Sequence, residues 1–193
     1  MPISFFKYFP APKYIGMPHV GFDISSNAIR YIELVKSPKG LTLGRFGTQD
    51  LSTPVVFDDK LASNQDLVLS LKKLQKTNRF NFVEISIPEE KAYLFTMEIP
   101  SGESEAVRNH IEFHLEENVP IALADAVFDY HIIKKGNKKG VDFASVSVVP
   151  RVVIEDYISL FEKCGMTPVS FLIENQAITR SIIGMEDLDT YLV

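Results

Sequence analysis

The sequence predicts a mixed α/β fold (α+β mixed), in which a strand-rich core is interrupted by a second, smaller unit. Over residues 20–34, apart from the turn at 25–27, apolar residues alternate with polar or small ones, which is the period of a strand with one buried face. Over 63–79, 103–118 and 151–164, apolar residues instead recur every three or four positions, as in an amphipathic helix. Strand and helix patterns therefore alternate along the chain, which favours helices packed on a sheet.

The first two strands are expected to form a hairpin. Val20, Phe22 and Ile24 alternate with small or polar residues, and a β-branched and aromatic run resumes at 29–34. Between them lie Ser25, Ser26 and Asn27, which are common turn residues.

A third strand (41–51), a helix (63–79) and a fourth strand (82–87) are expected next. Ser63 and Asp66 are placed to cap the first turn of the helix. Three strands, a helix and a buried strand, in this order, make the first part of an actin-like or ribonuclease-H-like core.

Residues 89–149 predict a compact β-α-β-β unit inserted in the core. Its helix carries an apolar stripe, is expected to be capped at Ser101, and stops before Pro120. The four elements are a strand at 92–99, a helix at 103–118 and strands at 126–133 and 141–149.

The predicted domains are an aromatic, proline-rich arm (1–19), a core formed by 20–88 and 150–193, and the inserted unit (89–149). The returning core has a helix at 151–164, a strand at 168–173, a short helix at 174–183 and the start of a strand at 190–193. The arm is expected to be extended, because prolines interrupt it. Its rings either pack on the body or face a partner or membrane; they are Phe5, Phe6, Tyr8, Phe9 and Tyr14.

Composition excludes several function classes. The net charge is -5 and the pI is about 5.4, which argues against binding nucleic acid through its phosphates. Cys164 is the only cysteine, so an intrachain disulfide and a thiolate metal cluster are excluded. No apolar run approaches the roughly 20 residues that span a bilayer, and no secretory signal is present. A cytoplasmic protein is expected.

The hairpin turn is the strongest candidate for a ligand site. Small polar side chains at Ser25, Ser26 and Asn27 leave room for an anion and add donors, while backbone N–H groups of such a turn converge. Asp23 would repel phosphate unless a divalent cation lay between them, so the pattern suggests a magnesium nucleotide. An ordinary β-hairpin explains the same residues.

A histidine pair does not indicate a zinc enzyme. His110 and His114 are four residues apart on a helix, but the order HIEFH is not HExxH and places Glu112 on another face. Surface or boundary residues explain the pair better.

Three segments, in this order, resemble the family of the type IV pilus assembly protein PilM, an actin-like relative of the division protein FtsA. They are GFDISSNAIRYIEL, IEFHLEENVPIALADAVFDYHII and VVPRVVIEDYISLFEKCGMTPVSFLIENQAITRSI. The match runs from about residue 10 to the last residue and covers roughly the first half of that family. It implies an actin-like half-domain with an inserted β-α-β-β subdomain as in PilM and FtsA, and hence a fragment, a truncated gene or a domain of a longer protein.

The resemblance also implies roles for individual residues. Asp23 matches the carboxylate that holds Mg through water, and residues 25–27 match the first phosphate loop, which commonly has Gly where this chain has Ser25. Arg30 replaces a common Lys. Glu174 begins a helix that, in relatives, places a polar side chain near the attacking water; capping of that helix is the alternative.

For function, the resemblance implies a cytoplasmic adaptor at the inner membrane. Its groove between core and inserted unit would receive the N-terminal peptide of a PilN-like membrane protein, with the strand at 92–99 and the helix at 103–118 as the region to search first. Other pilus assembly proteins are further expected partners. ATP and Mg would bind the intact protein, with weak ATPase activity at most, and would not bind tightly to these 193 residues.

Three other functions stay open from the sequence. They are an actin-like ATPase, an FtsA-like filament protein of cell division tethered to the membrane, and an interaction module that has lost nucleotide chemistry. ATP turnover by the full-length protein would support the first, polymer formation the second, and peptide binding that nucleotide does not affect the third.

Overall fold

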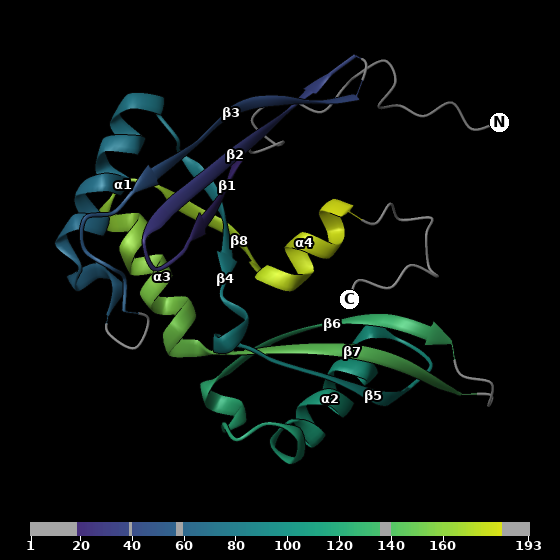
Figure 1. The fold of residues 1–193 in the computed structure, drawn as a ribbon. Helices are drawn as coiled ribbons and strands as arrows, with labels where there is room; N and C mark the ends of the chain where they lie inside the picture. Colours follow the sequence, from purple (N-terminus) through teal and green to yellow (C-terminus); the bar gives the residue numbers. More distant parts are fainter. Residues whose placement is uncertain (1–18, 39, 57–59, 136–139, 183–193) are drawn as a thin grey trace. The chain divides into compact units, whose positions relative to one another are not determined.

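The computed structural model describes residues 19–38, 40–56, 60–135 and 140–182 (Figure 1). The predicted arm up to residue 18, the tip at 136–139 and the last expected strand lie outside the described residues. The chain divides into two compact units, each described below by itself: Met1–Ser86 with Ile158–Leu172, and Ile87–Tyr157 with Ile173–Val193. Residues 150–157 and 173–193, which the sequence prediction places in the core, are thus grouped with the inserted unit.

The first unit is built on a five-stranded sheet in the order β3-β2-β1-β4-β8. β1, β2 and β3 are antiparallel neighbours, whereas β1 and β4 are parallel. The predicted hairpin with its turn at residues 25–27 is confirmed. The strands are β1 His19–Ile24, β2 Ala28–Ser37, β3 Gly40–Asp50, β4 Phe82–Ile87 and β8 Thr167–Ile173.

Helix α1 (Gln65–Asn78) and the C-terminal part of α3 (Arg151–Lys163), from Ile158 on, complete the core of this unit on one face of its sheet (Figure 1). Phe22 on β1 is 2% exposed and lies at the centre of an aromatic cluster. Its ring centroid is 5.7 Å from that of Phe80, 5.5 Å from that of Phe161 and 6.0 Å from that of Tyr31. This cluster joins the sheet to the C-terminal part of α3.

The cap of α1 differs from the prediction. Asn64, rather than Ser63 or Asp66, is the N-cap, and its side-chain oxygen accepts a hydrogen bond from the Leu67 N–H at 3.0 Å. The Asp66 carboxylate instead accepts from the N–H groups of Ser52 and Thr53. Adjacent residues that can all cap a helix are not distinguished by sequence spacing alone.

A β-bulge interrupts the pairing of β2 with β3. Ile32 pairs with Phe46 and Leu34 with Leu43, so Glu33 faces both Gly44 and Arg45. A Cβ atom on Gly44 would approach the Glu33 carboxylate and the Val35 side chain to 2.9 Å, which explains a glycine there.

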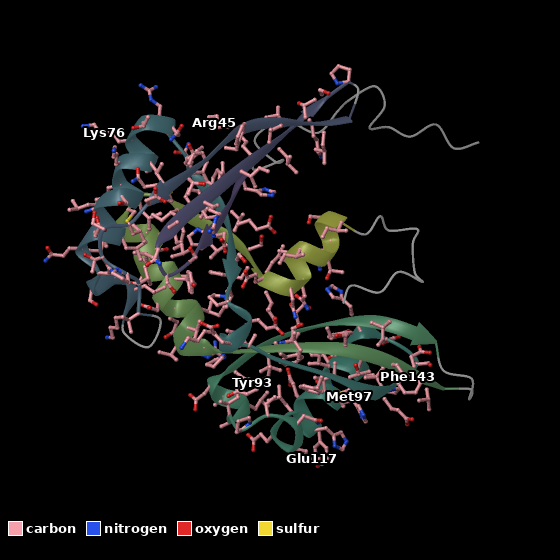
Figure 2. All side chains as sticks on the ribbon, viewed as in Figure 1. Arg45, Lys76, Tyr93, Met97, Glu117 and Phe143 are labelled. Atoms are coloured by element: carbon pink, nitrogen blue, oxygen red, sulfur yellow. The ribbon has the colours of Figure 1, made fainter. Side chains whose placement is uncertain are left out.

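The bulge positions an ion pair between the two strands. Arg45 donates to both Glu33 carboxylate oxygens, at 2.7 and 2.8 Å, and its guanidinium lies over the Phe80 ring. Arg45 also donates to the Asn78 carbonyl at the C-terminal end of α1, the end that carries Lys76 (Figure 2). The hydrogen bonds from Arg45 lower the pKa of Glu33 below its usual value of 4.5.

We expect Glu33→Gln to lower the free energy of unfolding by about 1–2 kcal/mol at neutral pH, since a charge-assisted, bidentate contact is lost. The Glu33 pKa is depressed in the folded state, so the stabilisation is present above pH 4.5 and is lost as the pH falls through the folded-state pKa. Urea unfolding at pH 7 and at about pH 3 should therefore show a difference between wild type and variant that shrinks in acid. An equal difference at both pH values would contradict this assignment.

The second unit has a three-stranded antiparallel sheet in the order β5-β7-β6. Its strands are β5 Tyr93–Pro100, β6 Ala126–Lys135 and β7 Val141–Pro150. Helix α2 (Ser104–Asn118) packs its apolar stripe on one face of the sheet, where Ile111 and Leu115 are fully buried. The predicted cap at Ser101 is wrong: Glu103 is the N-cap, and its side chain makes no capping hydrogen bond.

Helix α4 (Glu174–Ile182) lies on the other face of the same sheet (Figure 1). Gln176 donates to the Ser147 hydroxyl on β7 at 2.6 Å, and Arg180 is 2.9 Å from the ring of His131 on β6. Three short 3₁₀ helices complete the described elements: η3 Leu61–Ser63, η4 Glu89–Lys91 and η5 Leu123–Asp125.

Candidate functional site

The hairpin turn is closed by Ser25. Its N–H and its hydroxyl both donate to the Ala28 carbonyl, at 2.9 and 3.1 Å. The Ser25 N–H therefore serves the turn itself, unlike the expectation that all N–H groups of the turn converge on an anion.

The hydrogen-bond donors of Ser26 and Asn27, the next two residues of the turn, are available to a ligand. The Ser26 and Asn27 carbonyls accept from the N–H groups of Val55 and Leu51, at 2.7 and 2.8 Å, which anchors the turn to the segment after β3. Both residues are exposed, and within the described ranges their own N–H groups and side chains make no hydrogen bond. The turn thus offers up to four exposed donor groups to an anion.

The turn needs no glycine. None of residues 25–27 has a positive φ, since Arg79 is the one non-glycine residue with positive φ in the described parts of the chain. Ser25 therefore takes its place in the turn without backbone strain, although the resemblance described above leads one to expect a glycine there.

Asp23 and Arg30 face each other across the hairpin. They are register partners on β1 and β2, and the Arg30 guanidinium donates to the Asp23 carboxylate at 3.0 Å. The side chains are 36% and 55% exposed respectively, so both are accessible to a ligand. The two side chains lie next to the donors of the turn and fit a magnesium-bound phosphate. The Asp23 carboxylate suits the hydrated cation, and the Arg30 guanidinium suits the phosphate.

Glu174 is the first residue of α4 and is exposed. It belongs to the second unit, whereas the hairpin turn belongs to the first. A carboxylate in the first turn is favoured by the partial positive charge of a helix N-terminus, so capping remains an adequate reason for Glu174. Its role in hydrolysis stays a prediction.

Among the described residues, no strand pairs with the outer edge of β5 in the second unit. β7 lies in the middle of the sheet, so β5 is an edge strand, and its Tyr93 and Leu94 are 37% and 38% exposed. Figure 2 labels Tyr93 and Met97 along this strand. The sequence pointed to this strand as a partner region, but its place at the edge depends on β7 pairing between β5 and β6, for which no local signal exists.

The histidine pair on α2 is a surface feature. The ring centroids of His110 and His114 are 4.7 Å apart, and a carboxylate oxygen of Glu117 is 2.9 Å from His114 Nδ1. Glu112 instead accepts a hydrogen bond from Arg108. Across the described residues, no group of three or more His, Cys, Asp or Glu side chains could hold a metal ion.

A sequence profile of the family described as type IV pilus assembly protein PilM matches residues 21–188. The chain belongs to this family. No curated protein matches the chain in a sequence search.

Solved structures place the PilM-family chain in the same fold. One from a "PilM-PilN type IV pilus biogenesis complex" has a TM-score of 0.73 and 14% identity, and covers 84% of this chain and 49% of that chain. The cytoplasmic domain of EpsL, an inner membrane component of the type II secretion system of Vibrio cholerae, has a TM-score of 0.53 and 17% identity, with 79% and 56% covered. The predicted actin-like half-fold is confirmed, and the chain spans about half the length of these structures.

No helix in the described part of the chain is long and apolar enough to cross a bilayer.

Proposed function

We propose that this chain is part of a cytoplasmic adaptor of type IV pilus assembly, which binds the N-terminal peptide of a PilN-like protein of the inner membrane. Support comes first from the PilM profile, which extends over residues 21–188 and so over both units. It comes second from the similarity to a chain that was solved in a complex with PilN.

The free edge of β5 is the surface that suits such a peptide. An extended peptide that pairs with an edge strand gains main-chain hydrogen bonds and places alternate side chains against the sheet faces. β5 is eight residues long, and Leu94 lies on the face opposite α2, because it pairs with Ser147 rather than with the buried Val146 or Val148. A peptide of similar length could pair along the whole strand.

A nucleotide role belongs to the same proposal. ATP with Mg would bind the hairpin turn of the intact protein, with the N–H groups of Ser26 and Asn27 on phosphate, Arg30 beside it and Asp23 holding the hydrated cation. Magnesium would neutralise phosphate charge there. If intact binding is near 1 μM, about 8 kcal/mol, and half the contacts belong to the other half of the protein, these residues alone would bind at about 1 mM or weaker. Micromolar Mg-ATP binding by the 193-residue chain would contradict the assumption that half of the ATP contacts belong to the other half of the protein.

A polarisation titration tests the adaptor function. The probe is a fluorescein-labelled N-terminal peptide of the PilN-like protein from the same organism, and the chain is added to it in increasing amounts. We expect saturable binding, and no binding of a peptide with the same composition in scrambled order. If a folded chain leaves the native peptide unbound, the proposed partner site is wrong.

A matched pair of variants tests the β5 edge. Leu94→Glu on β5 and Val127→Glu on β6 change residues of nearly equal exposure, 38% and 37%, at opposite edges of the same sheet. We expect Leu94→Glu to weaken peptide binding at least tenfold, about 1.4 kcal/mol or more, since a charge replaces an apolar contact. Val127→Glu should leave the dissociation constant unchanged. A larger effect from Val127→Glu in the polarisation titration would move the site to the other edge.

A further inference from the structure

The β2–β3 hairpin carries an uncovered apolar surface. On the sheet face away from the aromatic cluster, five large apolar side chains are between 48% and 64% exposed. We name these residues the hairpin patch; they are Ile32, Leu34, Leu41, Leu43 and Phe46. Single exposed apolar residues are common, but a contiguous group of this kind marks an interaction surface.

Strand register shows that the patch is continuous. Ile32 pairs with Phe46 and Leu34 with Leu43, so these four side chains stand in two cross-strand pairs. Leu41 pairs with Lys36, two residues beyond Leu34, and so extends the same face. β3 is also an edge strand of 11 residues, and long apolar edge strands are usually covered by a loop or another segment.

β1, to which the N-terminal arm is joined, begins beside this patch. Val20 pairs with Glu33, so His19, the first residue of β1, is level with Leu34, and β2 continues to Ser37 beyond it. The β2–β3 hairpin therefore extends past the start of β1 (Figure 1). Residues 1–18 are joined to the chain at this point.

The arm has the composition and length to cover the patch. It holds five aromatic residues and no acidic residue. The part of the arm before β1, residues 1–18, reaches about 60 Å when extended, whereas β3 is about 37 Å long. Four prolines restrict its backbone, which lowers the entropy lost on docking. Its tether gives an effective concentration near the patch of about 1 mM, well above that of a free partner.

We propose that residues 1–18 fold back on the same molecule and pack their aromatic rings on the hairpin patch. The arm then covers the outer face and edge of β3 and prevents that strand from pairing with other chains. This role goes beyond the adaptor function, because it concerns the first unit and the arm alone.

A single-tryptophan reporter tests the proposal, since the sequence contains no tryptophan. Phe46→Trp places the reporter in the patch, and Leu69→Trp places a matched control on α1; the native residues are 64% and 66% exposed. In the full chain, we expect the Phe46→Trp reporter to be quenched by acrylamide with a slope about threefold or more below that of the control, because packed rings shield it.

Replacing Phe5, Phe6, Tyr8 and Phe9 together by serine should raise the slope of the Phe46→Trp reporter to that of the control, and should leave the Leu69→Trp slope unchanged. Equal slopes for the two reporters with the native arm would overturn the proposal. Shielding that survives the serine substitutions would overturn it as well, and so would shielding that disappears on dilution, because a second copy of the chain would then be the cover.

Discussion

Replacing Phe22 by alanine should lower the free energy of unfolding by about 3–5 kcal/mol, because a large, buried ring is removed from the core. Phe22 is 2% exposed, and its ring contacts the rings of Phe80 and Phe161. Truncation would leave a cavity where β1, the segment before β4 and α3 meet. Urea unfolding followed by circular dichroism measures the loss.

Leu69→Ala is the matched control for this substitution. Leu69 lies on α1 in the same unit and is 66% exposed, so its truncation should change the free energy of unfolding by less than about 0.5 kcal/mol. Similar losses for the two variants would show that the aromatic cluster does not hold the first unit together.

Replacing Asp23 by alanine in the full-length protein should remove Mg-dependent nucleotide affinity, by about 100-fold or 2.8 kcal/mol. The carboxylate is the group at the hairpin turn that suits a hydrated cation, and without it the Arg30 charge alone would attract phosphate. Titration of a fluorescent ATP analogue with Mg and with EDTA measures the Mg-dependent part.

A second variant, Asp23→Asn, and a check that both variants fold separate a loss of Mg binding from a loss of folding. Asp23→Asn keeps a hydrogen-bond acceptor for Arg30 but removes the charge, so it should lose Mg dependence like the alanine variant. The Asp23–Arg30 pair is exposed, and such pairs contribute less than about 1 kcal/mol, so both variants should remain folded. Unchanged Mg dependence in folded Asp23→Asn would show that the hairpin is a structural element only.

The sequence was sufficient for the elements whose pattern is local. Alternation of Val20, Phe22 and Ile24 predicts β1 because all three are buried on one face of the sheet. The stripe on α2 is equally clear, since Ile111 and Leu115 are fully buried. The observed bounds of these elements agree with the predicted ones to within a few residues.

Features that depend on strand register were not predictable. The Asp23–Arg30 contact needs the three-residue turn that makes the two residues partners, and the Glu33–Arg45 pair needs the bulge of β3 to lie opposite Glu33. The sequence also does not reveal that the Ser25 N–H donates to the Ala28 carbonyl and so closes the turn. The residue types at 23–30 were enough to predict a ligand site. Which N–H groups of the turn are left to bind a ligand depends on the hydrogen bonds that form when the strands pair.

Amide hydrogen exchange of the full chain, with and without saturating PilN-like peptide, tests the central proposal most directly. Pairing of the peptide with the edge of β5 (Tyr93–Pro100) should slow exchange of those β5 amides that point away from β7, and should leave the amides of β6, at the opposite edge, unchanged. No slowed amide in β5 at saturating peptide, or slowing confined to β6, would contradict it.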